Sequence, residues 1–247
     1  GYASFSRGYK SPTFNLFTYN PVPNKPEVLD AYEVGFKGDF FDGRLRLNGA
    51  AFYYDISAPQ VQLFEGSSIL LANAESGEVK GLELEGQVAV TSGLVGRFAF
   101  NNLDSNYTSF PNAPSGPQNP NTPYGSIPMI EIDASGNHMP MSPKFTMNLG
   151  FDYQLSTSHG DFTLSADYYY NDGYFFEPDN LLHQSSYNLF NAQLKYAPND
   201  YFAARIWGKN LSGEKYAIGA TTQGGAPGYP FIPGAPREFG VAFDFSF

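Results

Sequence analysis

The chain has 247 residues, a formal net charge of −10, and 23 Phe and 18 Tyr against a single Trp. The negative charge argues against a nucleic-acid partner, because phosphate binding needs clustered Lys and Arg and the sequence has no such cluster. The absence of cysteine excludes disulfides and thiolate metal sites, and no apolar run reaches the ~18 residues of a helical membrane span.

Ten segments of the sequence alternate between apolar and polar residues, with the period of two that a β-strand imposes on its side chains. They lie near residues 2–7, 31–38, 44–55, 79–90, 94–105, 144–155, 161–171, 186–196, 201–210 and 237–247. Most have the length of a tilted strand that crosses a bilayer, ~9–11 residues. The sequence therefore predicts an all-β fold with ten strands.

The predicted strands have one apolar face and one charged face. The final strand, for example, places Phe239, Val241 and Phe243 on one side and Glu238 and Asp244 on the other. The charged face of the other strands carries Glu33, Lys37, Arg46, Glu83, Glu85, Arg97, Asp152, Asp167, Lys195, Arg205 and Lys209. A cation that faces lipid at mid-membrane costs ~2–4 kcal/mol, so this segregation is expected of a membrane barrel. A soluble sandwich also alternates.

The lengths of the connections distinguish these two folds. Every second connection is a short turn (38–43, 91–93, 156–160 and 197–200), and the others are long (8–30, 57–77, 107–141, 173–184 and 211–235). Short inner turns and long outer loops are typical of transmembrane barrels, whereas loops beyond ~12–15 residues are uncommon in compact domains. The sequence therefore predicts an antiparallel transmembrane β-barrel whose charged face lines the interior.

Seven segments, in order along the chain, resemble the C-terminal half of the TonB-dependent outer-membrane receptors. They are YASFSRGYKSPTFN (2–15), KPEVLDAYEVGFKGDFFDGRLRLNGAAFYYDI (25–56), NAESGEVKGLELEG (73–86), MPMSPKFTMNLGFDY (139–153), SYNLFNAQLKY (186–196), WGKNLSGEKY (207–216) and GAPREFGVAFDFSF (234–247). The resemblance implies that residues 1–247 form the last ten of twenty-two barrel strands, without the plug domain and TonB box. Because Gly1 falls within a strand-like pattern, we interpret it as a cut inside a longer protein.

The resemblance also implies a function and partners. It implies active uptake of a ferric siderophore or similar scarce nutrient across the outer membrane of a Gram-negative bacterium, energised through TonB. The implied partners are outer-membrane lipid, the ferric ligand, the protein's own plug domain, TonB and the barrel-assembly machinery. The terminal Phe243, Phe245 and Phe247 resemble the signal that this machinery recognises. We expect no enzymatic activity, catalytic residue, cofactor or metal site.

Other functions stay open at this point. Receptors for cobalamin, haem or oligosaccharide share these barrel motifs, and the sequence of a passive porin would show the same alternating strands. A barrel enzyme would need a nucleophile and a base clustered at the outer rim, and the loops offer no convincing set.

Aromatic and polar residues of the outer loops are the candidates for ligand contact. Stacking surfaces with few rotamers suit a bulky, partly aromatic chelate, although packing between loops explains the same residues. They are Phe17, Tyr19, Phe64, Tyr107, Phe110, Tyr124, His138, Phe175, Phe176 and Tyr229. On the charged face, Glu83 and Glu85 are expected to pair with Arg46 and Arg97 on flanking strands and to help hold a plug.

Overall fold

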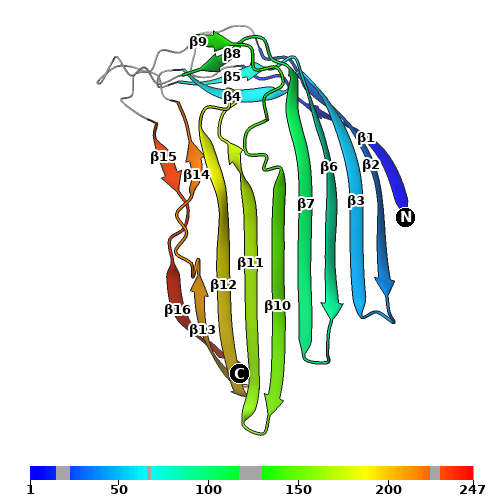
Figure 1. Cartoon of the computed structure of the whole chain (residues 1–247), viewed down its shortest axis with the longest axis vertical. Helices are drawn as coiled ribbons and strands as arrows, with labels where there is room; N and C mark the ends of the chain where they lie inside the picture. Colours follow the sequence, from blue (N-terminus) through cyan, green and yellow to red (C-terminus); the bar gives the residue numbers. More distant parts are fainter. Residues whose placement is uncertain (15–22, 66–67, 117–129, 223–228, 247) are drawn as a thin grey trace.

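The computed structural model describes residues 1–14, 23–65, 68–116, 130–222 and 229–246, and every regular element in these ranges is a β-strand (Figure 1). In the same ranges, no helix is long and apolar enough to cross a membrane. Phe247, the last residue of the expected assembly signal, lies outside the described part of the chain.

Ten strands form one antiparallel sheet in the order β1-β2-β3-β6-β7-β10-β11-β12-β13-β16, so each strand pairs with its neighbours along the chain. Their bounds are β1 Tyr2–Lys10, β2 Glu27–Phe40, β3 Leu45–Ser57, β6 Ser76–Ala89, β7 Leu94–Ser109, β10 Phe145–Thr157, β11 Gly160–Phe175, β12 His183–Asn199, β13 Phe202–Lys209 and β16 Glu238–Phe245. The ten strands predicted from the alternating pattern are confirmed, and so is the all-β fold.

The strands differ from the prediction mainly at their outer ends, where they are longer. For example, β2 begins at Glu27, β7 continues to Ser109 and β11 continues to Phe175. The pattern underestimates these ends because backbone pairing continues there, while residues such as 105–109 (SNYTS) have no regular apolar face. Strand pairing therefore extends beyond the alternating, apolar-faced segments.

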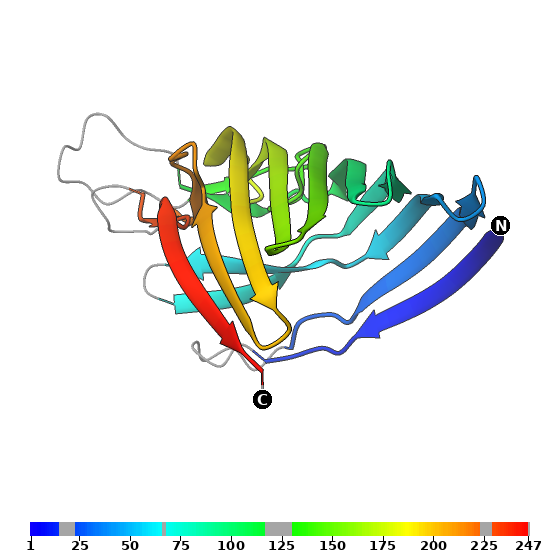
Figure 2. The ribbon, with the colours of Figure 1, turned by 90° about the horizontal axis from the view of Figure 1, so that it is seen from below.

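Three further two-stranded sheets lie within the long outer connections and were not predicted. They are β4 (Gln60–Glu65) with β5 (Ser68–Asn73), β8 (Ala113–Ser115) with β9 (Ile130–Ile132), and β14 (Ala217–Ala220) with β15 (Phe231–Pro233). In Figure 1 these hairpins gather at the end of the sheet opposite the short turns. The sheet itself is strongly curved, and Figure 2 shows β4 and β5 crossing its concave side.

Aromatic rings cover glycines on directly opposed strands at six places in the sheet. The pairs are Tyr2–Gly35, Phe36–Gly49, Phe52–Gly81, Phe98–Gly86, Trp207–Gly240 and Phe239–Gly208. In each pair an added Cβ would lie within 3.1 Å of an atom of the opposing ring. The missing side chain therefore leaves the space that the ring fills, and such pairs help to fix strand register in curved sheets.

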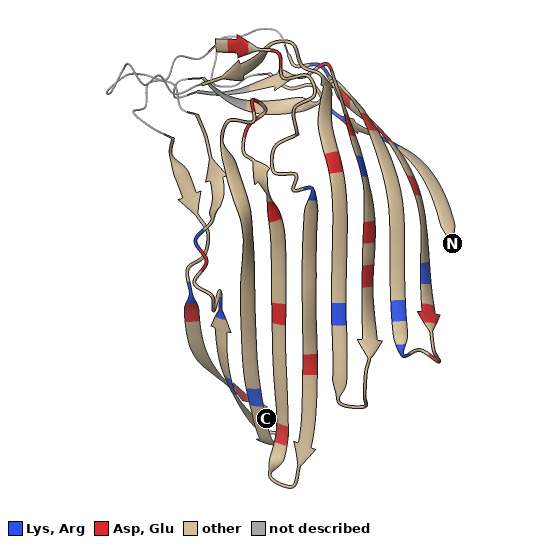
Figure 3. Ribbon diagram, viewed as in Figure 1, with Lys and Arg blue, Asp and Glu red and all other residues tan. Residues whose placement is uncertain are grey.

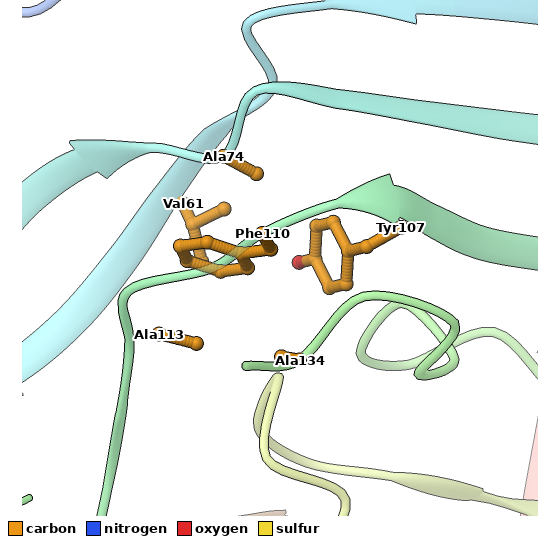
Figure 4. Packing of buried hydrophobic residues seen from close by; sticks show 6 residues of the cluster. All are labelled: Val61, Ala74, Tyr107, Phe110, Ala113 and Ala134. Carbon is orange, nitrogen blue, oxygen red and sulfur yellow. The ribbon is translucent and has the colours of Figure 1, made fainter. Parts of the chain in front are cut away.

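The apolar face of the ten-stranded sheet is open, and the buried hydrophobic cluster of the described chain lies elsewhere. Val34, Leu82 and Ile206 on the apolar face are 58%, 60% and 57% exposed. The buried cluster consists of Val61, Ala74, Tyr107, Phe110, Ala113 and Ala134, from the outer end of β7 and the connections above it (Figure 4). Apolar surface of this extent on a sheet marks contact with a partner or a membrane.

Candidate functional site

Three hollows lie on the charged face of the sheet, which is its concave side. The first, about 470 Å³, is lined by Glu33, Lys37, Glu83 and Glu85 among uncharged residues of β1 to β11. The second, about 410 Å³, is lined by Arg97, Asp152, Asp167, Arg205, Trp207 and Lys209. Figure 3 shows these acidic and basic positions distributed along the strands. The concave side therefore presents charges of both signs within shallow, polar hollows.

The expected pairing of Glu83 and Glu85 with Arg46 and Arg97 is wrong. Arg46 Nε lies 2.8 Å from Asp39 Oδ1, and Arg97 forms its ion pair with Asp152. Strand register explains the difference. Asp39 is directly opposite Arg46 on β2, whereas on β6 both arginines are opposite Gln87 instead of either glutamate.

The two glutamates share hollows with cations but do not pair with them. Lys37 lines the first hollow beside both, and the third hollow, about 270 Å³, is lined by Glu85 together with Arg46 and Arg97. The amide of Asn48 donates to Glu85 Oε1 at 2.9 Å, and Glu83 is opposite Ala50 and Asn101 in the register. Within the described ranges neither forms an ion pair, since the salt bridges found there involve other residues. This leaves two carboxylates on the concave face without a cationic partner.

Two cations lie directly opposite each other on the same face. Lys195 of β12 pairs in register with Arg205 of β13, and Arg205 Nε is buried without a hydrogen-bond partner among the described residues. Like charges directly opposite on neighbouring strands destabilise a sheet, and an unsatisfied buried donor adds a further cost.

The outer connections pack on one another through the buried cluster shown in Figure 4. Val61 and Ala74 come from the connection between β3 and β6. Tyr107, Phe110 and Ala113 come from β7 and the connection after it, and the rings of Tyr107 and Phe110 are 5.1 Å apart. These connections therefore form a folded layer with a small core of its own, which we call the outer cap (the described residues of 58–75, 110–143 and 176–182).

Hydrogen bonds join the third part of the cap to the second. The backbone N–H of His138 donates to Asn180 Oδ1 at 2.8 Å, and the Asn180 amide donates back to the His138 carbonyl at 2.9 Å. The Ser115 hydroxyl donates to Asp179 Oδ2 at 2.9 Å, and both residues are buried. Reciprocal bonds of this kind fix the relative position of two loops.

A half-buried carboxylate, Glu177, ties the cap to the connection that follows β13. It accepts hydrogen bonds from the hydroxyls of Thr221 and Thr222, both at 2.7 Å, and from the Thr222 backbone N–H at 3.0 Å. Burial raises the pKa of Glu177, and the hydrogen bonds from Thr222 and Thr221 oppose that effect. Nearby, the Tyr174 hydroxyl donates to the Ala217 carbonyl at 3.0 Å.

A cavity of about 420 Å³ lies where the cap meets the outer ends of β2, β3 and β7. Its lining includes Glu27, Gln60, Val61, Tyr107, Met139 and Phe176. Among the described residues of the lining Glu27 is the one charged side chain, and it accepts a 2.6 Å hydrogen bond from the Gln60 backbone N–H. The cavity thus combines an apolar wall, uncharged polar groups and a single carboxylate, a composition that suits small-molecule binding.

The structure brings two of the predicted ligand contacts, Tyr107 and Phe176, into this cavity. It places His138 elsewhere, with its ring stacked on Phe175 at 5.9 Å, and it buries Phe110 in the cluster. The Tyr229 hydroxyl donates to the Gly116 carbonyl at 3.2 Å. The remaining predicted contacts lie outside the described part of the chain: Phe17, Tyr19, Tyr124 and the side chain of Phe64.

Sequence reasoning missed two polar residues of the cavity, Glu27 and Gln60, because no motif distinguishes a polar residue beside a loop.

The described residues contain no group of three or more His, Cys, Asp or Glu side chains placed to hold a metal ion.

Comparison with known proteins identifies the fold. Residues 1–211 match the family described as "TonB dependent receptor-like, beta-barrel". The chain belongs to the TonB-dependent receptor β-barrel family. None of the curated proteins compared with the sequence matches it.

Solved structures of siderophore receptors share the fold of this TonB-dependent receptor chain. The ferric yersiniabactin uptake receptor FyuA of Yersinia pestis is 18% identical with a TM-score of 0.79, over 99% of this chain and 34% of its own. The siderophore receptor PiuA of Acinetobacter baumannii is 24% identical, TM-score 0.69, over 89% and 28%. Pyoverdine-bound FpvA of Pseudomonas aeruginosa is 17% identical, TM-score 0.67, over 99% and 30%. The chain thus spans about a third of the length of these receptors.

Proposed function

We propose that this chain is the C-terminal part of the barrel of an outer-membrane receptor that takes up a ferric siderophore or a similar scarce nutrient, energised through TonB. The observation that carries the proposal is the folded cap, with its 420 Å³ cavity, placed over the concave charged face of a receptor-family sheet. In this proposal the cap captures the ligand, and the concave face surrounds the plug that gates its passage.

The open apolar face supports a location in the outer membrane of a Gram-negative bacterium. In every strand of the sheet except β7, aliphatic or aromatic residues remain exposed, including Val34, Leu149 and Val241. Burial in hydrocarbon stabilises such side chains by ~25 cal/mol per Å². In the same proposal, the terminal strand with Phe243, Phe245 and Phe247 is what the barrel-assembly machinery recognises.

The unbalanced charges of the concave face support docking of a plug domain. Glu83 and Glu85 form no ion pair in the described structure, and neither do the opposed Lys195 and Arg205. A plug domain with cationic groups beside Glu83 and Glu85, and anionic groups beside Lys195 and Arg205, would neutralise all four charges. We propose that these four residues contact the plug. The remaining charges of the concave face, including Lys37, Asp167 and Lys209, keep the interior polar.

The proposal is tested with the full-length receptor, purified in detergent and titrated with a series of ferric chelates while intrinsic fluorescence is followed. We expect saturable binding of at least one chelate, and uptake of its radioactive iron by cells only when TonB is present. Uptake that persists without TonB would point to a passive porin. Saturable binding of cobalamin, haem or an oligosaccharide, with no response to any ferric complex, would replace the siderophore by that ligand.

A further inference from the structure

The three outer connections that form the cap contain no Lys or Arg. Residues 58–75, 110–143 and 176–182 carry six carboxylates, Glu65, Glu75, Glu131, Asp133, Glu177 and Asp179, and their only other titratable side chains are Tyr124 and His138. By contrast, the strands mix both signs, with Arg46, Arg97 and Lys195 among the acids. The one-sided charge is therefore a property of the cap, and cations begin at its borders: Lys144 directly follows its second part, and Lys25 is hydrogen-bonded through its backbone to Gln60 and Asn73.

The fold concentrates these carboxylates at one place. The hydrophobic cluster joins the first connection to the second, and the Asn180–His138 and Ser115–Asp179 bonds join the second to the third. In Figure 3 an acidic band marks β9, and no basic band lies on β4, β5, β8 or β9. Charges of one sign around a mouth with low-dielectric walls focus the field on whatever approaches.

Five of the six carboxylates, all except Glu65, have side chains that the structure describes, and none of these five forms an ion pair within the described ranges. Glu75 accepts from the Ser109 hydroxyl, Asp133 from the Ser135 backbone N–H, and Asp179 from the Ser115 hydroxyl. These donors are neutral, so the negative charge of each ionised group persists. The cavity below the cap adds Glu27, whose donor is the Gln60 backbone N–H.

We propose that the ligand of this receptor is a neutral or cationic complex and not a polyanionic one. The inference rests on the proposed uptake function and specifies its substrate class. A polyanion would approach against the field of the cap and would meet Glu27 in a cavity whose described lining contains no cation to pair with it. An uncharged or cationic complex meets no such barrier, and a cationic group gains a charge-assisted hydrogen bond with Glu27.

Ferric chelates allow the charge to be varied while the metal stays the same. Three hydroxamates neutralise Fe³⁺ and give a neutral complex, and a free amine on the same ligand makes it cationic. Three catecholates leave the complex trianionic. The inference therefore predicts that the full-length receptor binds tris-hydroxamate complexes and discriminates against tris-catecholates.

The test measures association rates of the three chelate types with the full-length receptor in detergent at low and high salt. We expect the tris-catecholate to associate at least tenfold more slowly than the neutral complex at low salt, with the gap closing as salt screens the cap. Glu131→Lys, at an exposed position of β9 with no hydrogen bond among the described residues, should speed tris-catecholate association about threefold to tenfold.

Asp200→Lys is the matched control, because it makes the same charge change in the short turn at the opposite end of the sheet, and it should leave all three rates unchanged. Tris-catecholate binding as fast and as tight as that of the neutral complex would overturn the inference and leave the uptake function intact. Failure of every ferric chelate to bind would overturn both.

Discussion

Glu177 shows how one residue couples two outer connections. Burial moves its pKa above the ordinary 4.5, while hydrogen bonds from Thr222 and Thr221 act in the opposite direction and the charge of Asp179 adds to the rise. Because the folded-state pKa is the higher one, the folded loop holds the proton more tightly than the unfolded loop does. The contribution of Glu177 to stability is therefore fully present below pH 4.5 and is lost as the pH rises through the raised value.

The upward shift of the Glu177 pKa predicts how the contact between residues 176–182 and 217–222 depends on pH. Amide hydrogen exchange of residues 217–222, corrected for the intrinsic pH dependence of exchange, should become faster as the pH rises from 4.5 through the raised pKa of Glu177. Glu177→Gln, which resembles the protonated carboxyl, should abolish that dependence. Glu177→Ala removes the acceptor and should lower the free energy of local opening by about 2 kcal/mol below pH 4.5, and by less as the pH rises through the raised pKa of Glu177.

The control for this measurement is Glu131→Gln, which changes an exposed carboxylate of β9 that makes no hydrogen bond within the described residues. It should leave the pH dependence at 217–222 as in the wild type. A slope that survived in Glu177→Gln would show that another group carries it.

For single residues, the sequence predicts which side chains share a face of the sheet but not which of them are in contact. The period of two places Arg46, Glu83 and Glu85 on one side of the sheet without any knowledge of register. Their partners depend on register, which sets Arg46 opposite Asp39 and leaves Glu85 opposite Asn48. Contacts such as Glu27 with Gln60 depend on how two loops meet, and no local pattern encodes that.

Between neighbouring strands, packing and register depend on each other most closely at the glycine–aromatic pairs. A Cβ on Gly86 would lie 2.4 Å from Phe98 Cζ and 3.0 Å from the Arg46 carbonyl oxygen. We predict that Gly86→Ala destabilises the full-length barrel by about 1–3 kcal/mol, because the ring or the strand must move. The measurement is the urea midpoint of barrel unfolding in detergent micelles.

Gly96→Ala provides the comparison, since β7 is paired on both sides within this chain and a Cβ there would meet one atom within 4 Å, the movable methyl carbon Val88 Cγ1 at 3.3 Å. Its unfolding midpoint should match that of the wild type or exceed it slightly, because alanine restricts the unfolded chain more than glycine does. Equal losses in the two variants would mean that glycine content, and not the opposed ring, sets the effect.

The elements also show where sequence patterns stop being informative. The middle of each strand is predictable, because lipid on one side and a polar interior on the other force alternation. Outside that layer the constraint ends, so the ends of β7 and β11 and the hairpins β4–β5, β8–β9 and β14–β15 are missed. Their formation depends on contacts between connections, such as the packing of Val61 against Phe110.

For the whole molecule, the order of the strands leaves β1 and β16 at the two edges of the sheet. Each edge pairs on one side only within this chain, and hydrocarbon does not tolerate unpaired backbone groups. The chain covers about a third of the length of the receptors it matches. Stability is therefore a property of the full-length barrel, and measurements of the membrane fold need that protein.

The distinction between the two faces can be tested at one depth with two adjacent residues of β10. Leu149 lies on the apolar face opposite Phe98 and Tyr168, and Asn148 lines the first hollow of the concave face. Leu149→Lys should destabilise the full-length barrel in phospholipid vesicles by about 2–4 kcal/mol, because the ammonium group is placed in hydrocarbon.

Asn148→Lys places the same charge one residue away, where Glu83 and Glu85 line the same hollow, and it should leave stability within about 0.5 kcal/mol of the wild type. Urea titrations of both variants in vesicles supply the comparison. If the two lysines cost the same, the apolar face does not contact lipid. The assignment of inside and outside, on which the cap and the concave face both depend, would then be reversed or lost.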